Sequence, residues 1–142
     1  MEPPNAPAVL QRLVAATNTH DLDALVACFS PDYVNETPVH PDRNFRGREQ
    51  VRANWAQIFA AVPDVETTVH DWALNGESLW VEMEQRGTRP DGQPLALRGV
   101  NIFGIGDDRI RSIRFYMEPV QHDGTDIDAA VQSHVGARSA AS

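Results

Sequence analysis

The sequence LALRGVNIFGIGDDRIRSIRFYMEP, residues 95–119, decides the fold of this chain. Apolar and polar side chains alternate on both sides of the turn Gly106-Asp107-Asp108, which predicts two long antiparallel strands. The face that we expect to be apolar carries Leu97, Gly99, Asn101, Phe103, Ile105, Ile113, Phe115 and Met117. Asn101 is the single amide on this face. If the face lines a pocket, Asn101 is its polar anchor.

Composition indicates one acidic domain. The 142 residues are enough to bury the core of a single domain. The formal net charge of -8 disfavours contact with a phosphate backbone, so we expect no nucleic-acid partner. No stretch approaches the roughly 20 apolar residues of a membrane span, and the opening MEPPNAPAV lacks the pattern of a signal peptide. We therefore expect no membrane association and a cytoplasmic location.

Helical spacing of apolar residues comes first along the chain. The predicted helices span about residues 8–19, 21–30 and 48–61. Asp21 is expected to cap the second helix, and Pro31 and Pro63 end the second and third. A short strand over residues 32–37 and the proline-bearing loop PVHPDRNFRG separate these two helices.

From Asp64 onward the pattern changes to alternation. The runs VETTVHDWAL and SLWVEMEQRGT, with turns at Asn75-Gly76 and Pro90-Asp91-Gly92, lead into the strand pair of residues 95–119. Helices followed by an antiparallel meander indicate an α+β domain in which the helices pack on one face of a curled sheet.

The predicted domain occupies residues 8–119. Residues 1–7 form a proline-rich N-terminal arm, and residues 120–142 form a C-terminal extension. In this extension Asp126 is expected to cap a short helix, which is followed by a frayed tail.

The second face of the sheet has a different composition. We expect Leu79, Val81, Met83 and Gln85 to face the helices, and Trp80, Glu82, Glu84, Arg98, Arg114 and Tyr116 to face outward. Aromatic side chains among arginines are typical of a subunit interface. We therefore predict a homodimer through this outer face.

The order of these motifs resembles the SnoaL-like branch of the NTF2-like superfamily. The segments HDLDALVACFSPDYV, FRGREQVRANW and RGVNIFGIGDDRIRSIRFYME carry the resemblance, which covers about residues 8–118. It implies a cone-shaped α+β barrel, with three N-terminal helices packed on a strongly curved, mostly antiparallel sheet around an apolar cavity. Members include polyketide cyclases, ketosteroid isomerases, epoxide hydrolases and dehydratases, so the fold alone does not fix a reaction.

The catalytic groups of these relatives fall on other residue types in this chain. The resemblance places the isomerase tyrosine at Leu13, the isomerase base at Thr37 beside Glu36, and the protonated acid of the oxyanion hole at Asn101. The carboxylate that the cyclases carry on the last strand falls at Phe115. None of these positions can supply the relatives' acid–base chemistry.

Strand register decides which charged groups reach the cavity. Glu82 and Glu84 fall near the polar residues of the epoxide hydrolases, whose arginine has no counterpart here. A shift of one residue would turn both carboxylates and Arg114 into the cavity. The alternation in SLWVEMEQRGT favours an outward position for them.

The candidate site residues follow from these placements. The candidates for catalysis are Asn101, His40, Glu36 and Tyr33, and those for ligand binding are Leu13, Trp55, Phe59, Val81, Met83, Gln85, Phe103, Phe115 and Met117. Histidine is a common general base, and His40 lies in the proline-bearing loop, so it is a candidate base. The alternative role of Asn101 is structural, with its amide hydrogen-bonded to neighbouring groups within the sheet. The alternative role of the ligand-binding candidates is to pack in the core without touching a ligand. The histidines lack metal-binding spacing, and we expect neither a metal nor a cofactor.

Two classes of function remain open. One is a cofactor-independent enzyme of the cyclase, isomerase or dehydratase kind, acting on a small, largely apolar ring compound. It needs a titratable group in the cavity. The other is a non-catalytic ligand-binding or dimeric scaffold protein, which the residues at positions 13, 37, 101 and 115 favour.

Overall fold

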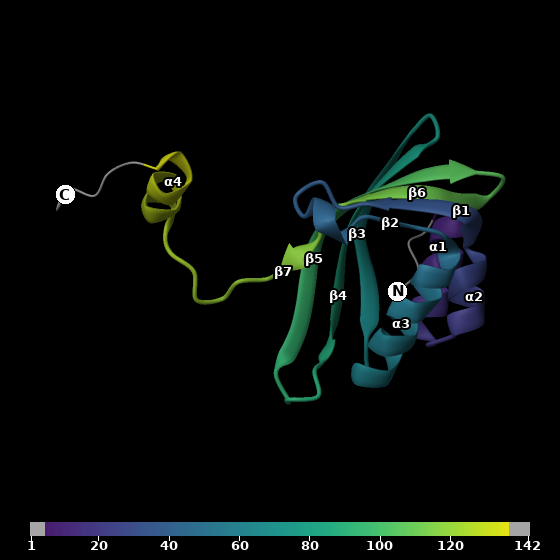
Figure 1. The fold of residues 1–142 in the computed structure, drawn as a ribbon, viewed down its shortest axis with the longest axis horizontal. Helices are drawn as coiled ribbons and strands as arrows, with labels where there is room; N and C mark the ends of the chain where they lie inside the picture. The colour runs from purple at the N-terminus through teal and green to yellow at the C-terminus, as the bar shows by residue number, and fades with distance from the viewer. Residues whose placement is uncertain (1–4, 137–142) are drawn as a thin grey trace.

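The structure is a computed structural model that describes residues 5–136 of the chain. The helices are α1 (Ala8–Asn18), α2 (Leu22–Ala27), η1 (Pro41–Arg43, a 3₁₀ helix), α3 (Arg48–Ala61) and α4 (Ile127–Val135). The strands are β1 (Phe29–Glu36), β2 (Phe45–Arg46), β3 (Glu66–Asn75), β4 (Ser78–Thr88), β5 (Pro94–Gly106), β6 (Arg109–Phe115) and β7 (Glu118–Pro119). This order confirms the predicted α+β class (Figure 1).

The first two helices form much as their sequence predicts. α1 buries one apolar face, made by Val9, Leu10, Leu13 and Val14. Asp21 caps α2, because its carboxylate accepts a hydrogen bond from the backbone N–H of Ala24. α2 ends earlier than predicted, at Ala27. Phe29 already belongs to β1, where it pairs with Ile110 of β6, so strand pairing overrides the helical spacing at this residue.

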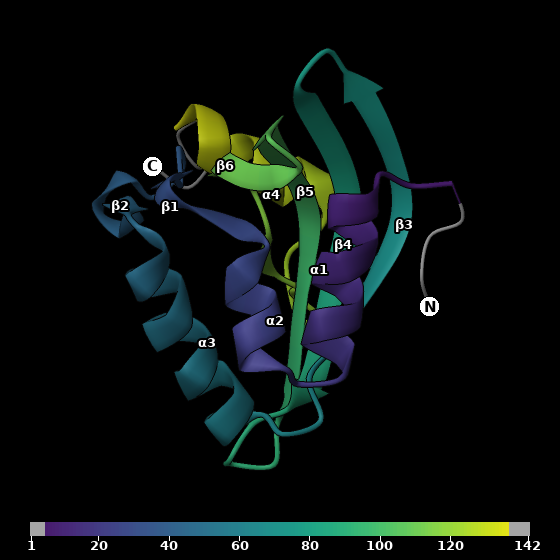
Figure 2. The same cartoon turned by 90° about the vertical axis from the view of Figure 1, so that its right-hand side faces the viewer.

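The third helix has the predicted bounds but is only partly buried. Val51 is its one buried residue, and Trp55, Ile58 and Phe59 are half-buried. Figure 2 shows α3 at a distance from α1, with α2 between them and the sheet behind. The apolar stripe of α3 therefore does not close fully on the sheet.

The sheet is mixed, curved and open. Its strand order is β2-β1-β6-β5-β4-β3, with β7 paired to β5, and only the β1–β6 pair is parallel. Register shifts interrupt the β1–β6, β3–β4 and β5–β6 pairs, which bends the strands. In Figure 1, β1 and β6 run across the end of the molecule above the helices. The edge strands β2 and β3 do not pair with each other, so the sheet does not close.

The strand register agrees with the predicted faces. Asn101 of β5 lies between Val81 of β4 and Phe115 of β6, and Glu84 pairs with Arg98. Neighbours across a sheet share a face, so the amide lies on the inner face and the charged pair on the outer face. The alternative register, shifted by one residue, does not occur.

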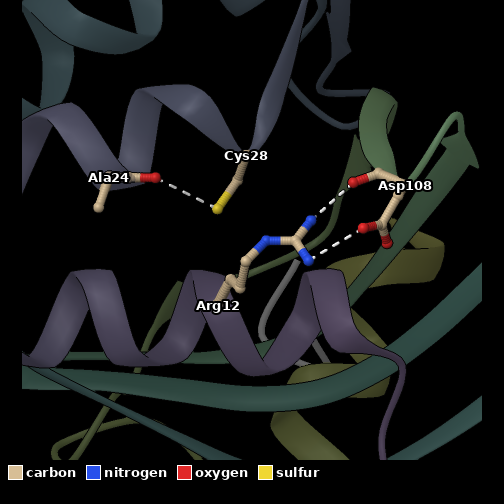
Figure 3. Close-up of polar contacts among 4 residues, drawn as sticks. All are labelled: Arg12, Ala24, Cys28 and Asp108. Atoms are coloured by element: carbon tan, nitrogen blue, oxygen red, sulfur yellow. Dashed lines mark hydrogen bonds and ion pairs between the residues drawn. The ribbon is translucent and has the colours of Figure 1, made fainter.

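The β5–β6 turn is held by the first helix. Asp107 and Asp108 both have positive φ, 51° and 58°, as a two-residue hairpin turn requires. Arg12 of α1 donates hydrogen bonds to the Asp108 carboxylate at 3.0 Å and to its carbonyl oxygen at 2.7 Å (Figure 3). Nearby, the Cys28 thiol donates to the Ala24 carbonyl oxygen at 3.4 Å, and burial raises its pKa. Cys28 is thus a reduced structural thiol.

The last predicted strand is interrupted in the structure. β6 ends at Phe115, and β7 resumes at Glu118, which pairs with Arg98 of β5. The chain between them passes directly over Gly99, where an added Cβ would lie 2.9 Å from the Met117 Cα. The Met117 side chain is buried in the core.

The C-terminal extension stands away from the domain. Asp126 caps α4 as predicted, and the helix ends at Gly136 in the left-handed conformation. Figure 1 shows α4 separated from the sheet by an extended segment. The predicted frayed tail lies beyond residue 136, outside the described residues. Within residues 5–136, no helix has the length and apolar character needed to cross a membrane.

Candidate functional site

A pocket of about 620 Å³ lies between α3, α1 and the inner face of the sheet. This size is typical of small-molecule sites. The predicted site residues that line the pocket are Leu13, Tyr33, Trp55, Met83, Gln85, Asn101, Phe103 and Phe115. They come from α1, β1, α3, β4, β5 and β6. The incomplete burial of α3 follows from this arrangement, because part of its apolar stripe faces the pocket.

Asn101 is a buried amide with an unsatisfied oxygen. Its side chain is 3% exposed, and its Nδ2 lies 3.2 Å from the Met117 sulfur and 3.4 Å from the Met83 sulfur. Thioether sulfur accepts weakly and cannot donate, so the amide nitrogen belongs on this side. The Oδ1 atom has no partner. A buried acceptor without a hydrogen bond costs about 1–3 kcal/mol of stability.

The inner face of β1 carries a row of hydrogen bonds. The Tyr33 hydroxyl donates to the Asn35 Oδ1 at 3.1 Å, and the Asn35 Nδ2 donates to the Thr37 Oγ1 at 3.2 Å. All three residues are buried and line the pocket. Burial raises the pKa of Tyr33 far above its ordinary value, so the phenol stays protonated. Because Thr37 accepts in this row, its own hydroxyl proton remains free.

A second unpartnered polar atom of the pocket wall lies on β3. Asn18, at the end of α1, fixes the Thr67 backbone: its Oδ1 accepts from the Thr67 N–H at 2.7 Å, and its Nδ2 donates to the Thr67 carbonyl at 3.0 Å. The Thr67 Oγ1 is buried without a partner, and the residue lines the pocket. The pocket wall thus holds two of the unsatisfied buried polar atoms of the described chain.

Polar side chains of α3 and η1 also line the pocket. Gln50 donates to Asn54 at 2.9 Å along α3, and Gln57 follows on the same helix. Arg43 of η1 is exposed, and no ion pair or hydrogen bond of its guanidinium is present among residues 5–136.

Two of the predicted acid–base residues lie outside the pocket lining. Glu36 is exposed, and its neighbour across the β1–β6 pair is Arg114. His40 instead approaches Glu118 of β7, with 2.7 Å between its Nε2 and the carboxylate. The side chains alternate along β1, so Glu36 points away from Tyr33 and Asn35. The structure does not bring either group to Asn101.

Three predicted ligand-binding residues also lie outside the lining. Val81 is fully buried in the core, and Phe59 is half-buried and packs 5.5 Å from Trp55 between ring centroids. Met117 lies behind Asn101, with its sulfur on the amide nitrogen. These side chains support the pocket wall.

The ionisable side chains in the lining are Tyr33 and Arg43. The lining contains neither a carboxylate nor an imidazole, so the acidic residues that give the chain its net charge of -8 lie outside the pocket. Across residues 5–136, the structure places no group of three or more His, Cys, Asp or Glu residues that could hold a metal ion.

Sequence reasoning missed several polar residues of the pocket. Asn35 and Thr67 were not named as site residues, and Thr37 was named only as the position of the isomerase base, although the alternation in DYVNET and VETTV places all three on inner faces. Arg43 carried no periodic signal, because the path of the proline-bearing loop depends on its own turns. The Thr37 N–H bonds to the Asn44 side chain at 2.7 Å, which closes that loop.

The outer face of the sheet is exposed. Trp80 and Tyr116 are 43% and 38% exposed. Arg98 lies 3.9 Å from Glu82, and His70 approaches Glu84 at 2.9 Å. Glu82 and Glu84 therefore belong to a charged sheet surface and not to the pocket.

Solved structures share this architecture. One is a hypothetical protein with a ketosteroid isomerase-like fold from Catenulispora acidiphila, in complex with trimethylamine. Its TM-score is 0.69 at 20% sequence identity, and the match covers 79% of this chain and 87% of that protein. An LEH-like epoxide hydrolase from M. tuberculosis has a TM-score of 0.68 at 18% identity, and the match covers 79% of this chain and 81% of the hydrolase. A candidate polyketide cyclase from Sinorhizobium meliloti has a TM-score of 0.63 at 23% identity, with 80% and 96% covered. These likenesses show the fold alone.

The sequence itself identifies the family. No curated protein matches the chain. The profile of the SnoaL-like domain matches residues 10–113, which run from α1 to β6 and include nearly the whole pocket wall. The chain therefore belongs to the SnoaL-like domain family and has an NTF2-like fold.

Proposed function

We propose that this protein binds a small, largely apolar ring molecule in the pocket between α3 and the sheet. The observation that carries the proposal is Asn101, whose buried Oδ1 lacks a partner in the pocket wall. A fold keeps such an atom at a cost in stability, and a ligand that donates a hydrogen bond to it removes that cost. Aromatic and aliphatic side chains around it, among them Phe103, Phe115 and Trp55, suit flat apolar rings.

The pocket chemistry supports binding over proton abstraction. A general base must lie within hydrogen-bond reach of the proton it removes. The ionisable lining residues are Tyr33, whose pKa is raised by burial, and Arg43, which is a permanent cation. Both act as donors at neutral pH. Hydrogen bonding and apolar contact are the interactions that these groups provide.

A calorimetric titration with two-ring aromatic compounds tests this proposal. We expect binding with a negative heat-capacity change, which is the mark of apolar burial. The matched variants are Phe103→Ala, which enlarges the pocket, and Val39→Ala, at an exposed loop position away from it. Phe103→Ala should weaken binding about tenfold or more through lost contacts. Equal affinities for the two variants would place the ligand elsewhere.

One observation favours a second candidate, a cofactor-independent enzyme related to the cyclases and isomerases. The Tyr33–Asn35–Thr37 row leaves a Thr37 hydroxyl proton for a substrate oxygen, and hydrogen bonds in a row strengthen one another. Such a donor can stabilise an enolate or alkoxide as it forms. Turnover of a ring ketone that Thr37→Val abolishes and Thr37→Ser retains would support this candidate.

We also propose a homodimer through the outer sheet face. Trp80 and Tyr116 form the apolar part of this face, and Arg98, Arg114 and Glu82 surround them. Such a mixture of aromatic and arginine side chains is typical of subunit interfaces. The pocket opens on the opposite side of the sheet, so pairing leaves it accessible.

A further inference from the structure

The polar groups of the pocket are arranged by chemical kind. Acceptor capacity lies at Asn101, whose unpartnered Oδ1 is held in place by the Met83 and Met117 sulfurs behind the amide. Donor capacity lies at Thr37, the end of the hydrogen-bonded row that begins at Tyr33.

These two groups lie on either side of one aromatic ring. Phe115 is the neighbour of Asn101 across the β5–β6 pair. Glu36 pairs with Arg114 across β1–β6, so Thr37 follows beside Phe115 on the other side. Strands in a sheet are about 4.8 Å apart, which puts the Asn101 and Thr37 backbones roughly 10 Å apart. An apolar surface thus separates the acceptor from the donor.

The loop that follows the donor also brings a cation to the pocket lining. The Thr37 N–H bonds to the Asn44 side chain, and Arg43 precedes Asn44 in the same closed loop. The Arg43 guanidinium has no ion-pair partner among residues 5–136, although the surrounding segments also carry the titratable groups Glu36, His40, Asp42, Arg46 and Glu118. His40 and Glu118 pair with each other at 2.7 Å. A hydroxyl donor beside a free guanidinium suits a carboxylate.

We propose that the ligand is a hydroxylated ring carboxylic acid. Its hydroxyl group donates to the Asn101 Oδ1, its rings lie against Phe115, and its carboxylate faces Thr37 and Arg43. The absence of any carboxylate from the pocket lining leaves nothing there to repel the anion. This inference rests on the proposed binding function and names its ligand class.

Three related compounds test the ligand class on the wild-type chain. The probes are 6-hydroxy-2-naphthoate, 2-naphthoate, which lacks the hydroxyl, and 2-naphthol, which lacks the carboxylate. We expect 6-hydroxy-2-naphthoate to bind about fivefold more tightly than 2-naphthoate and about tenfold more tightly than 2-naphthol in titrations at pH 7. Binding of all three within a factor of two overturns the ligand class but leaves the binding function standing. No binding by any of them contradicts both.

Single variants locate the two ends of the ligand. In the Arg43→Gln variant, 6-hydroxy-2-naphthoate should no longer bind more tightly than 2-naphthol. In the Asn101→Leu variant, it should no longer bind more tightly than 2-naphthoate. Arg46→Gln is the matched control, because Arg46 is exposed on neighbouring β2 and does not line the pocket. If Arg46→Gln weakens the binding of the two naphthoates as much as Arg43→Gln does, the effect comes from the general electrostatic field and the assignment of Arg43 is wrong.

Discussion

At the scale of single residues, two buried asparagines have different surroundings. Asn35 is satisfied on both sides, since its amide oxygen accepts from Tyr33 and its nitrogen donates to Thr37. Asn101 meets only sulfur on its nitrogen and nothing on its oxygen. Asn35 therefore contributes to stability, whereas Asn101 lowers it. A residue that a fold keeps against its own stability is a candidate for function.

Tyr33 gives the structure a predictable response to alkali. Burial raises its pKa in the folded state, whereas the unfolded chain titrates near the ordinary value of about 10. Above that pH the unfolded state has lost a proton that the folded state keeps, so the free energy of unfolding falls by about 1.4 kcal/mol per pH unit. Urea unfolding between pH 9 and 11 measures this slope.

The comparison with Tyr33→Phe isolates this response. The variant should show a slope that is shallower by about that amount, whereas Tyr116→Phe, which changes the exposed tyrosine, keeps the steep fall. Parallel curves for the wild-type chain and Tyr33→Phe would show that the buried phenol does not titrate differently on unfolding.

The sequence predicted which residues share a face, but not what each one touches. Alternation was enough to place Asn101 and Tyr33 on the inner side, and the pocket lining contains both. Met83, one thioether partner of Asn101, follows from the β4–β5 register, but the other, Met117, lies beyond the break after β6. Alternation along β1 also places Glu36 on the face opposite Tyr33. The position of His40 depends on the loop that follows, which has no periodic signal.

At the scale of elements, long periodic segments were predicted well and junctions were not. The bounds of α3 agree with the prediction, because the apolar stripe is continuous and Pro63 follows it. The short α2 was predicted too long, since Phe29 fits both a helical spacing and a strand. The break between β6 and β7 was missed, because its cause, the close approach of two backbones, lies at a glycine elsewhere in the chain.

Gly99 should therefore tolerate no side chain. Gly99→Ala would place a methyl group 2.9 Å from the Met117 Cα, and backbone cannot move aside as a flexible side chain does. We expect a loss of about 1–3 kcal/mol in the free energy of unfolding, together with weaker ligand binding as Met117 shifts behind Asn101.

Gly106→Ala is the matched change on the same strand. Its added methyl group meets only the side chain of Arg111, which can rotate away, so we expect a change below about 0.5 kcal/mol. Urea denaturation of both variants makes the comparison. Equal losses would mean that the crossing at Gly99 is not a tight contact.

At the scale of the whole molecule, the sheet separates two surfaces of different composition. Its inner face forms the pocket with α1 and α3, and its outer face presents exposed aromatic and charged side chains. The C-terminal helix α4 stands apart from both (Figure 1). The sequence predicted this division from the alternation along β4, since one face of that strand is apolar and the other carries the charges.

The proposed dimer depends on the outer face. Trp80→Glu adds a carboxylate beside Glu82 and Glu84 and removes an aromatic contact, so we expect sedimentation analysis to show a monomer. Val39→Glu is the control, because Val39 is an exposed apolar residue of the loop before η1. A wild-type chain that sediments as a monomer, or a Trp80→Glu variant that still sediments as a dimer, would contradict this assembly.

We propose that the Asn101 amide is kept for a ligand and not for the fold. The most direct test is the free energy of unfolding of the ligand-free variants Asn101→Leu and Asn35→Leu, measured by urea denaturation. Asn101→Leu removes an unsatisfied buried acceptor and should stabilise the chain by about 1–2 kcal/mol, whereas Asn35→Leu leaves Tyr33 and Thr37 without partners and should destabilise it by about 2 kcal/mol or more. If Asn101→Leu instead destabilises the chain as much as Asn35→Leu does, the amide supports the fold and the account of the pocket is wrong.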